Sequence, residues 1–138
     1  MSNPTMRAAA YRGRKQIAVE TRDLPQPGSA EVRVRLSACG LCGSDLHLFH
    51  TELPIVPPGT TMGHEMTGRV DLLGEAVSGL TVGETVVIEP LSTCGTCPWC
   101  LGGRDSICPG AQLYGIHRHG GFADYVTVPA HRLFPVPA

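Results

Sequence analysis

The stretch Glu31-Val32-Arg33-Val34-Arg35-Leu36-Ser37 alternates apolar and polar side chains with a period of two. In an extended chain, Val32, Val34 and Leu36 point to one face and the two arginines point to the other. One face would meet an apolar core while the other meets water. The pattern predicts an antiparallel strand that is buried on one side only, with Arg33 and Arg35 exposed and not part of a phosphate site.

Similar short apolar runs recur along the chain, and each is bounded by Gly, Pro or polar turn residues. We expect further strands at Arg7–Tyr11, Gln16–Thr21, Thr67–Leu73, Thr85–Glu89, Ala123–Val128 and Arg132–Val136. Helical patterns are short: Ser44 is a candidate cap for one turn, and Pro98–Gly103 is a candidate for another. Short strands with almost no helix predict a mainly β domain, either a closed or nearly closed antiparallel barrel or a sandwich.

The composition fits one compact domain over residues 1–138. Lys plus Arg number 11 and Asp plus Glu number 12, so the net charge is -1. This balance argues against a nucleic-acid partner, or an anionic membrane, held by bulk charge. No run approaches the roughly 20 apolar residues that cross a membrane, and no secretion signal opens the chain. We expect a cytoplasmic protein with no nucleic-acid or membrane partner.

Four cysteines stand at the spacing Cys-x2-Cys-x2-Cys-x7-Cys in a segment rich in Gly and Pro: Cys94, Cys97, Cys100 and Cys108. Four thiolates can close on one tetrahedral ion where the backbone turns this often. Such a site has no open coordination position. We therefore predict a structural zinc lobe over about residues 92–110. Iron in the same sulfur cage, disulfide bonds and a free redox pair are the alternatives.

Two other segments carry metal-binding residue types: Cys39-Gly40-Leu41-Cys42-Gly43-Ser44-Asp45-Leu46-His47 and Gly63-His64-Glu65. A thiolate, an imidazole and a carboxylate from separate loops suit a zinc site with three protein ligands and one exchangeable position. A redox pair of Cys39 and Cys42, or a His-Glu dipeptide on a polar surface, explains the same residues equally well.

The order and spacing of these motifs resemble those of the zinc-dependent medium-chain alcohol and polyol dehydrogenases. The resemblance runs from about Arg7 to the last residue and includes Gly68 after the His-Glu pair, the four cysteines, Gly120-Gly121-Phe122-Ala123-Asp124-Tyr125-Val126 and Val128-Pro129-Ala130. It implies a GroES-like fold: a partly open β-barrel with short helical turns that carries the active-site zinc, and a protruding structural-zinc lobe. A Rossmann domain follows in that family. It is absent from these residues, which contain no Gly-x-Gly-x-x-Gly between a strand and a helix.

The resemblance also implies a set of metal ligands. Cys42 and His64 match the catalytic zinc ligands, and Glu65 matches a carboxylate that either binds the ion or lies just behind it. The family's remaining strong ligand lies beyond position 138. Cys39 matches no ligand, and we expect it to be a small buried residue.

Three residues near Cys42 match groups that handle the substrate and its proton. Ser44 matches the hydroxyl that hydrogen-bonds the substrate oxygen, and His47 matches the outer member of a proton relay. Asp45 matches an acceptor that orients the His64 imidazole. The other histidines have no counterpart, and we expect them to be solvated: His50, His117, His119 and His131.

The implied function is that of the zinc-binding catalytic domain of an NAD(P)-dependent alcohol or polyol dehydrogenase, which converts an alcohol reversibly to an aldehyde or ketone by hydride transfer. The expected cofactors are one structural zinc, one catalytic zinc, and NAD or NADP. The expected substrate is a small-molecule alcohol or polyol, and any homo-oligomer would form through the missing domain. Without that domain, these residues alone should be inactive. The alternative is a non-catalytic, zinc-stabilised GroES-like binding module.

Overall fold

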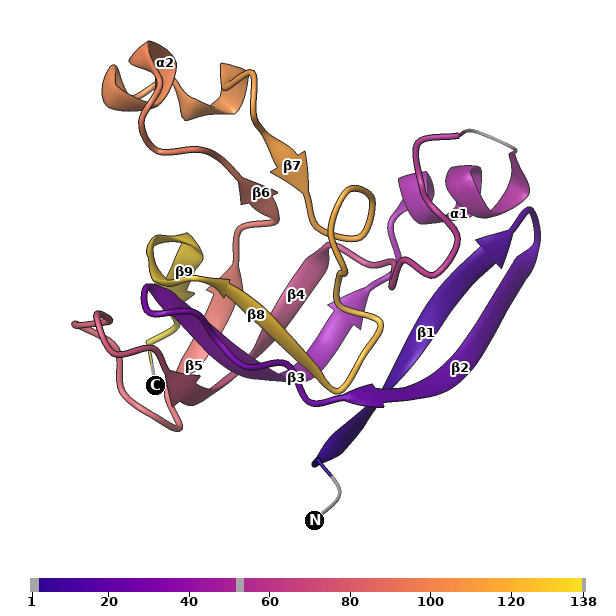
Figure 1. The fold of residues 1–138 in the computed structure, drawn as a ribbon, viewed down its shortest axis with the longest axis horizontal. Coiled ribbons are helices and arrows are strands. Elements are labelled where there is room, and N and C mark those ends of the chain that lie inside the picture. The colour runs from indigo at the N-terminus through magenta and orange to yellow at the C-terminus, as the bar shows by residue number, and fades with distance from the viewer. Residues whose placement is uncertain (1–2, 52–53, 138) are drawn as a thin grey trace.

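The computed structural model describes residues 3–51 and 54–137 as a mainly β structure (Figure 1). The described residues form nine strands: β1 (Thr5–Gly13), β2 (Gln16–Asp23), β3 (Glu31–Gly40), β4 (Glu65–Leu73), β5 (Thr85–Ile88), β6 (Leu91–Ser92), β7 (Gln112–Leu113), β8 (Tyr125–Pro129) and β9 (Leu133–Pro135). Helical segments are short: α1 (Gly43–His50), α2 (Pro98–Leu101), and the 3-10 turns η1 (Asp105–Ile107) and η2 (Ala130–Arg132). In the part of the chain that the structure describes, no helix is long and apolar enough to cross a membrane.

Five strands form the central antiparallel sheet, in the order β8-β3-β4-β5-β9. Strands β1 and β2 form a separate hairpin, which joins the rest through single bridges from Ala8 to Ala123 and from Ala10 to Thr61. A third pair, β6 and β7, leads into the cysteine segment. Within residues 3–51 and 54–137 these sheets do not join into a closed barrel. The expected barrel is therefore partly open.

Strand β3 lies inside the central sheet and carries its core. Val32 and Val34 are fully buried, as their alternation with arginines predicts. Arg35 is exposed, but the prediction for Arg33 is wrong. Its Nε donates to Asp71 Oδ2 on β4 at 2.6 Å, and the side chain is mostly covered. An ion pair with the neighbouring strand thus replaces water on this part of the face.

The first turn of α1 differs from the prediction in its cap. Cys42 is the N-cap residue, and Ser44 lies inside the helix. The reason is the acidic side chain three positions after the cap, because Asp45 Oδ2 accepts the Cys42 N–H at 3.0 Å. Elsewhere the predicted strands are all present, with ends within three residues of those observed.

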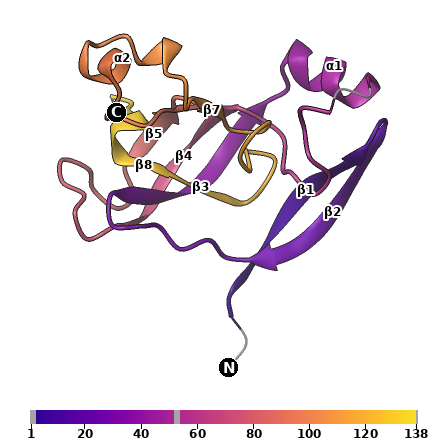
Figure 2. The same ribbon diagram turned by 45° about the horizontal axis from the view of Figure 1, so that its top comes forward.

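The cysteine lobe, about residues 92–110, extends away from the central sheet and stands apart from α1 (Figures 1 and 2). It has little apolar core, since Leu101 and Ile107 are exposed. Arg132, buried at the end of η2, ties the lobe to the sheet. Its guanidinium donates to Glu89 Oε2 at 2.6 Å, to Thr93 Oγ1 at 2.6 Å, and to Asp105 in η1.

Arg132→Ala is expected to lower the free energy of unfolding by about 2 kcal/mol, less than for a fully buried pair because both carboxylates stay partly hydrated. The lobe should loosen before the sheet, because Glu89 directly after β5 keeps its backbone hydrogen bond to Arg132 O, whereas the Arg132 side-chain contacts to Thr93 and Asp105 are lost. Urea unfolding and proteolysis after Arg104 measure the two effects. Arg35→Ala, on an exposed arginine of β3, is the matched control and should change stability by less than about 0.5 kcal/mol. Equal effects of the two substitutions would contradict this role for Arg132.

Candidate metal centre

Helix α1 holds Cys42 at its N-terminus and is fixed at both ends. At the start, the buried Asp45 carboxylate satisfies the Cys42 N–H and complements the positive end of the helix dipole. At the other end, the tip of the β1–β2 hairpin lies against the last turn (Figure 1). Lys15 N donates to Phe49 O at 2.7 Å, and Arg14 Nε donates to His50 O at 3.0 Å. The helix therefore presents Cys42 from a constrained position.

Two glycines make room for the other metal-binding side chains. Gly63, which precedes His64, has a φ of +88°, and a Cβ there would lie 2.8 Å from Cys39 Sγ. Gly40 ends β3 opposite Glu65, and a Cβ on it would lie 2.2 Å from Glu65 Oε2. A side chain at Gly63 would therefore clash with Cys39 and strain the backbone, and one at Gly40 would displace the Glu65 carboxylate.

The pairing of β3 with β4 brings the separated donors together. One ligand atom from each of Cys42, His64 and Glu65 lies within 4.8 Å of the other two. Ser44 Oγ lies 3.4 Å from His64 Nε2, so a hydroxyl stands beside this three-donor site. His47, three positions after Ser44 on α1, is exposed. The residues that the sequence predicts for one site are thus clustered.

The arrangement of His64 fits a metal ligand. Its Nδ1 is buried and has no hydrogen-bond partner among the described residues, and the nearest carboxylate oxygen, Asp45 Oδ1, is 3.7 Å away. A ligating histidine usually directs its other ring N–H at such an acceptor. A thiolate, an imidazole and a carboxylate also form the mixed donor set of open zinc sites. The three-donor site can therefore hold zinc.

The four cysteines of the lobe also fit a single ion. The Sγ atoms of Cys97 and Cys100 are 3.5 Å apart, those of Cys108 and Cys94 are 3.5 Å apart, and those of Cys94 and Cys100 are 3.8 Å apart. Zinc–sulfur bonds of about 2.3 Å in a tetrahedron place sulfurs about 3.8 Å apart, whereas a disulfide needs about 2.05 Å. All four thiols are free. The geometry matches a tetrahedral sulfur cage and not a disulfide.

The backbone of the lobe favours thiolates. Hydrogen bonds from the Thr96 and Cys97 N–H groups, followed by those from the Cys108 and Cys97 thiols, lower the pKa of Cys94 to about 6. Cys100 N also donates to Cys97 Sγ at 3.4 Å. The Arg104 guanidinium lies over the Trp99 ring, 4.9 Å from its centroid. Backbone amides therefore stabilise the negative charge here.

The sequence profile of the family "Alcohol dehydrogenase GroES-like domain" matches residues 28–138. The chain belongs to this family. L-threonine 3-dehydrogenase of Xanthomonas oryzae pv. oryzae is a relative, 40% identical over an alignment of 126 positions that covers 89% of this chain and 37% of the relative.

Solved structures agree with this membership in the GroES-like family. A Sinorhizobium meliloti 1021 protein assigned as a zinc-binding dehydrogenase and bound to NADP superposes with a TM-score of 0.87 at 40% identity, covering 98% of this chain and 39% of that one. Galactitol-1-phosphate dehydrogenase from Escherichia coli superposes with a TM-score of 0.88 at 35% identity, covering 95% and 38%. This GroES-like chain therefore spans less than two fifths of the length of each of these three proteins.

In this GroES-like chain, Cys39 is less buried than expected, and the supporting roles of two other residues were not predicted. Cys39 is half-buried beside Gly63 and Gly121, and burial raises the pKa of its thiol to about 11. That surrounding suits a packing residue better than a redox partner of Cys42. The supporting roles of Gly40 and Arg132 had no local signal in the sequence, because each depends on a residue that folding brings from elsewhere.

Proposed function

We propose that this chain is the catalytic domain, residues 1–138, of a zinc-dependent dehydrogenase that oxidises a small-molecule alcohol or polyol with NAD or NADP. The observation that carries the proposal is the three-donor site with the Ser44 hydroxyl beside it. The residues of this chain supply at most three donors to that site, so they do not close it and leave room for an exchangeable ligand, as in catalytic zinc sites. A four-cysteine cage offers no such position.

Cys42 and His64 would hold the catalytic zinc, and Glu65 would either hold it or lie behind it. Bound there, zinc supplies Lewis acidity to the substrate hydroxyl. Asp45 would accept the Nδ1 proton of His64, which fixes the ring so that Nε2 points to the site. The lobe cysteines would hold a second, structural zinc: Cys94, Cys97, Cys100 and Cys108.

Ser44 and His47 would handle the proton of the substrate. Ser44 Oγ is close enough to the three-donor site to accept a hydrogen bond from an alcohol there. Ser44 and His47 are three residues apart on α1, so their side chains share one side of the helix. The exposed His47 ring can pass the proton to solvent, because it lies at the surface and an imidazole nitrogen can accept or donate a proton.

The relatives support the substrate and cofactor classes. Their names specify L-threonine and galactitol 1-phosphate, both of which carry hydroxyl groups, and one neighbour holds NADP. A non-catalytic zinc-stabilised module is less favoured, because a purely structural site needs neither an open position nor a nearby hydroxyl.

Ser44→Ala tests the proposal in the purified full-length protein. We expect NAD or NADP reduction with an alcohol, L-threonine or galactitol 1-phosphate, and a fall in kcat of at least about 100-fold in the variant, the usual scale for a lost proton-transfer group. Zinc content should stay unchanged, because a hydroxyl is not among the donors. Ser78→Ala, on an exposed serine of the β4–β5 loop, is the control and should keep full activity. Turnover that survives Ser44→Ala would contradict the role of Ser44, and no turnover with any of these alcohols would contradict the function.

A further inference from the structure

The segment that carries His64 is held by the loop that precedes β8. Three backbone hydrogen bonds join them: Gly120 N to Thr61 O at 2.7 Å, Gly121 N to Gly63 O at 2.8 Å, and Phe122 N to Met62 O at 2.9 Å. The Thr61 N–H is used differently, because it donates to a side chain of the loop, His119 Nδ1, at 3.2 Å. His119 therefore completes the attachment of the segment that ends in a metal-binding residue.

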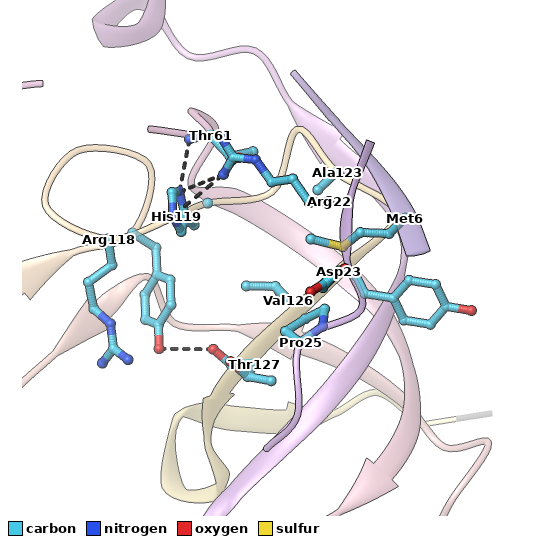
Figure 3. A pocket seen from close by; sticks show the side chains of 13 residues that line it. Met6, Arg22, Asp23, Pro25, Thr61, Arg118, His119, Ala123, Val126 and Thr127 are labelled. Atoms are coloured by element: carbon cyan, nitrogen blue, oxygen red, sulfur yellow. Dashed lines mark hydrogen bonds between the residues drawn. The ribbon is translucent and has the colours of Figure 1, made fainter. Parts of the chain in front are cut away.

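This contact requires a neutral imidazole. Arg22 Nη1 lies 3.1 Å from the same His119 Nδ1, and both arginine and a backbone N–H can only donate (Figure 3). Two donors converging on Nδ1 need its lone pair. A proton on Nδ1 would remove the acceptor and place a second positive charge beside Arg22.

The surroundings of His119 favour the neutral ring. Burial lowers its pKa, the charge of Arg22 lowers it further, and the Glu20 carboxylate opposes both. Other charged or titratable groups lie around the two adjoining hollows that His119 lines: Asp23, Arg118, Tyr114, Tyr125 and His117. His119 is nevertheless an exposed residue, so solvent protons can reach the ring.

The hollow beside His119 has a volume of about 320 Å³, and several of the polar groups around it already have protein partners. Arg22 also donates to Thr61 Oγ1 at 3.1 Å, and Tyr114 OH donates to Thr127 O at 3.2 Å (Figure 3). Arg118 donates to Ser92 Oγ at 3.1 Å. These three side chains are therefore engaged in internal contacts.

We propose that His119 is a positioning residue for the His64 segment: its neutral ring accepts the Thr61 amide proton, and protonation of the ring breaks this hydrogen bond and loosens the segment. The link to catalysis rests on the proposed function. The unfolded-state pKa of histidine is about 6.5, and the folded-state value of His119 is lower. The hydrogen bond from Thr61 N to His119 Nδ1 is therefore complete above about pH 6.5. It is lost as the pH falls through the folded-state pKa of His119.

Amide hydrogen exchange at Thr61, corrected for the intrinsic rate at each pH, tests this proposal. In the wild type, protection should fall about fivefold on acidification below pH 6, as for one lost hydrogen bond. His119→Asn keeps an acceptor oxygen near the Nδ1 position and cannot be protonated, so this step should disappear. His119→Leu should lower Thr61 protection at every pH. His131→Asn, on an exposed histidine of η2, should behave like the wild type.

Two results would overturn the proposal: equal Thr61 protection in the wild type and His119→Leu at pH 7.5, or an acid step that persists in His119→Asn. The kcat/KM profile gives the catalytic readout, with an extra fall of about fivefold below pH 6 in the wild type relative to His119→Asn. Parallel kcat/KM profiles for the wild type and His119→Asn would refute the link between His119 and His64. Amide exchange needs no turnover, so a protein without dehydrogenase activity would refute the proposed function while the exchange data still decide the role of His119.

Discussion

Cys42→Ser is expected to weaken zinc binding at the three-donor site by more than about 100-fold and to abolish alcohol oxidation. Loss of a residue that hydrogen-bonds a metal-binding side chain typically lowers metal affinity by about 10- to 100-fold. Loss of the metal-binding side chain itself should lower it at least as much. Serine is nearly the same size as cysteine but does not provide a thiolate at neutral pH. The measurement is zinc content after dialysis against a weak chelator, together with NAD and NADP reduction.

Cys39→Ser is the matched control for this substitution. It removes a thiol three residues away that lies outside the three-donor site. Because the Cys39 thiol is half-buried and its pKa is raised, a small loss of stability is expected without loss of zinc. If Cys42→Ser retains two zinc ions per chain and normal turnover, Cys42 is not a ligand.

The alternation of Val32 and Val34 with arginines was enough to predict β3, because a half-buried strand reveals itself in its own sequence. The surroundings of Arg33 were not predictable in this way. Its partner Asp71 comes from β4, 38 positions along the chain, and only the register of the two strands brings the pair together.

The two candidate metal sites also differ in how well the sequence alone could predict them. The four lobe cysteines lie within one short segment, so their spacing alone predicted a cluster, and the sulfur distances match a single ion. Cys42 and His64 come from separate loops, and their residue types suited a zinc site no better than the alternatives, so the resemblance to a family was the stronger indication that they meet. The role of Gly40 depends on its pairing with Glu65 across the sheet, which spacing cannot reveal.

Cys97→Ser is expected to remove one zinc from the lobe and unfold the lobe locally. Apparent binding free energies of structural zinc reach about 10–16 kcal/mol in small zinc-binding peptides, so the ion contributes much of the stability where an apolar core is small. The central sheet should remain folded, because its core is made of buried side chains from β3, β4, β5 and β8. Stability is therefore lost in the lobe first.

Trp99 allows this local change to be measured, because it is the single tryptophan of the chain and lies in α2 within the lobe. Its ring packs under Arg104 and is 39% exposed, so unfolding should shift its fluorescence to longer wavelength. Zinc content should fall by one ion per chain while the far-ultraviolet β signal persists. Cys39→Ser should leave both the fluorescence and the zinc content unchanged. Unaltered Trp99 fluorescence with full zinc content in Cys97→Ser would show that the four cysteines do not form a zinc-dependent lobe.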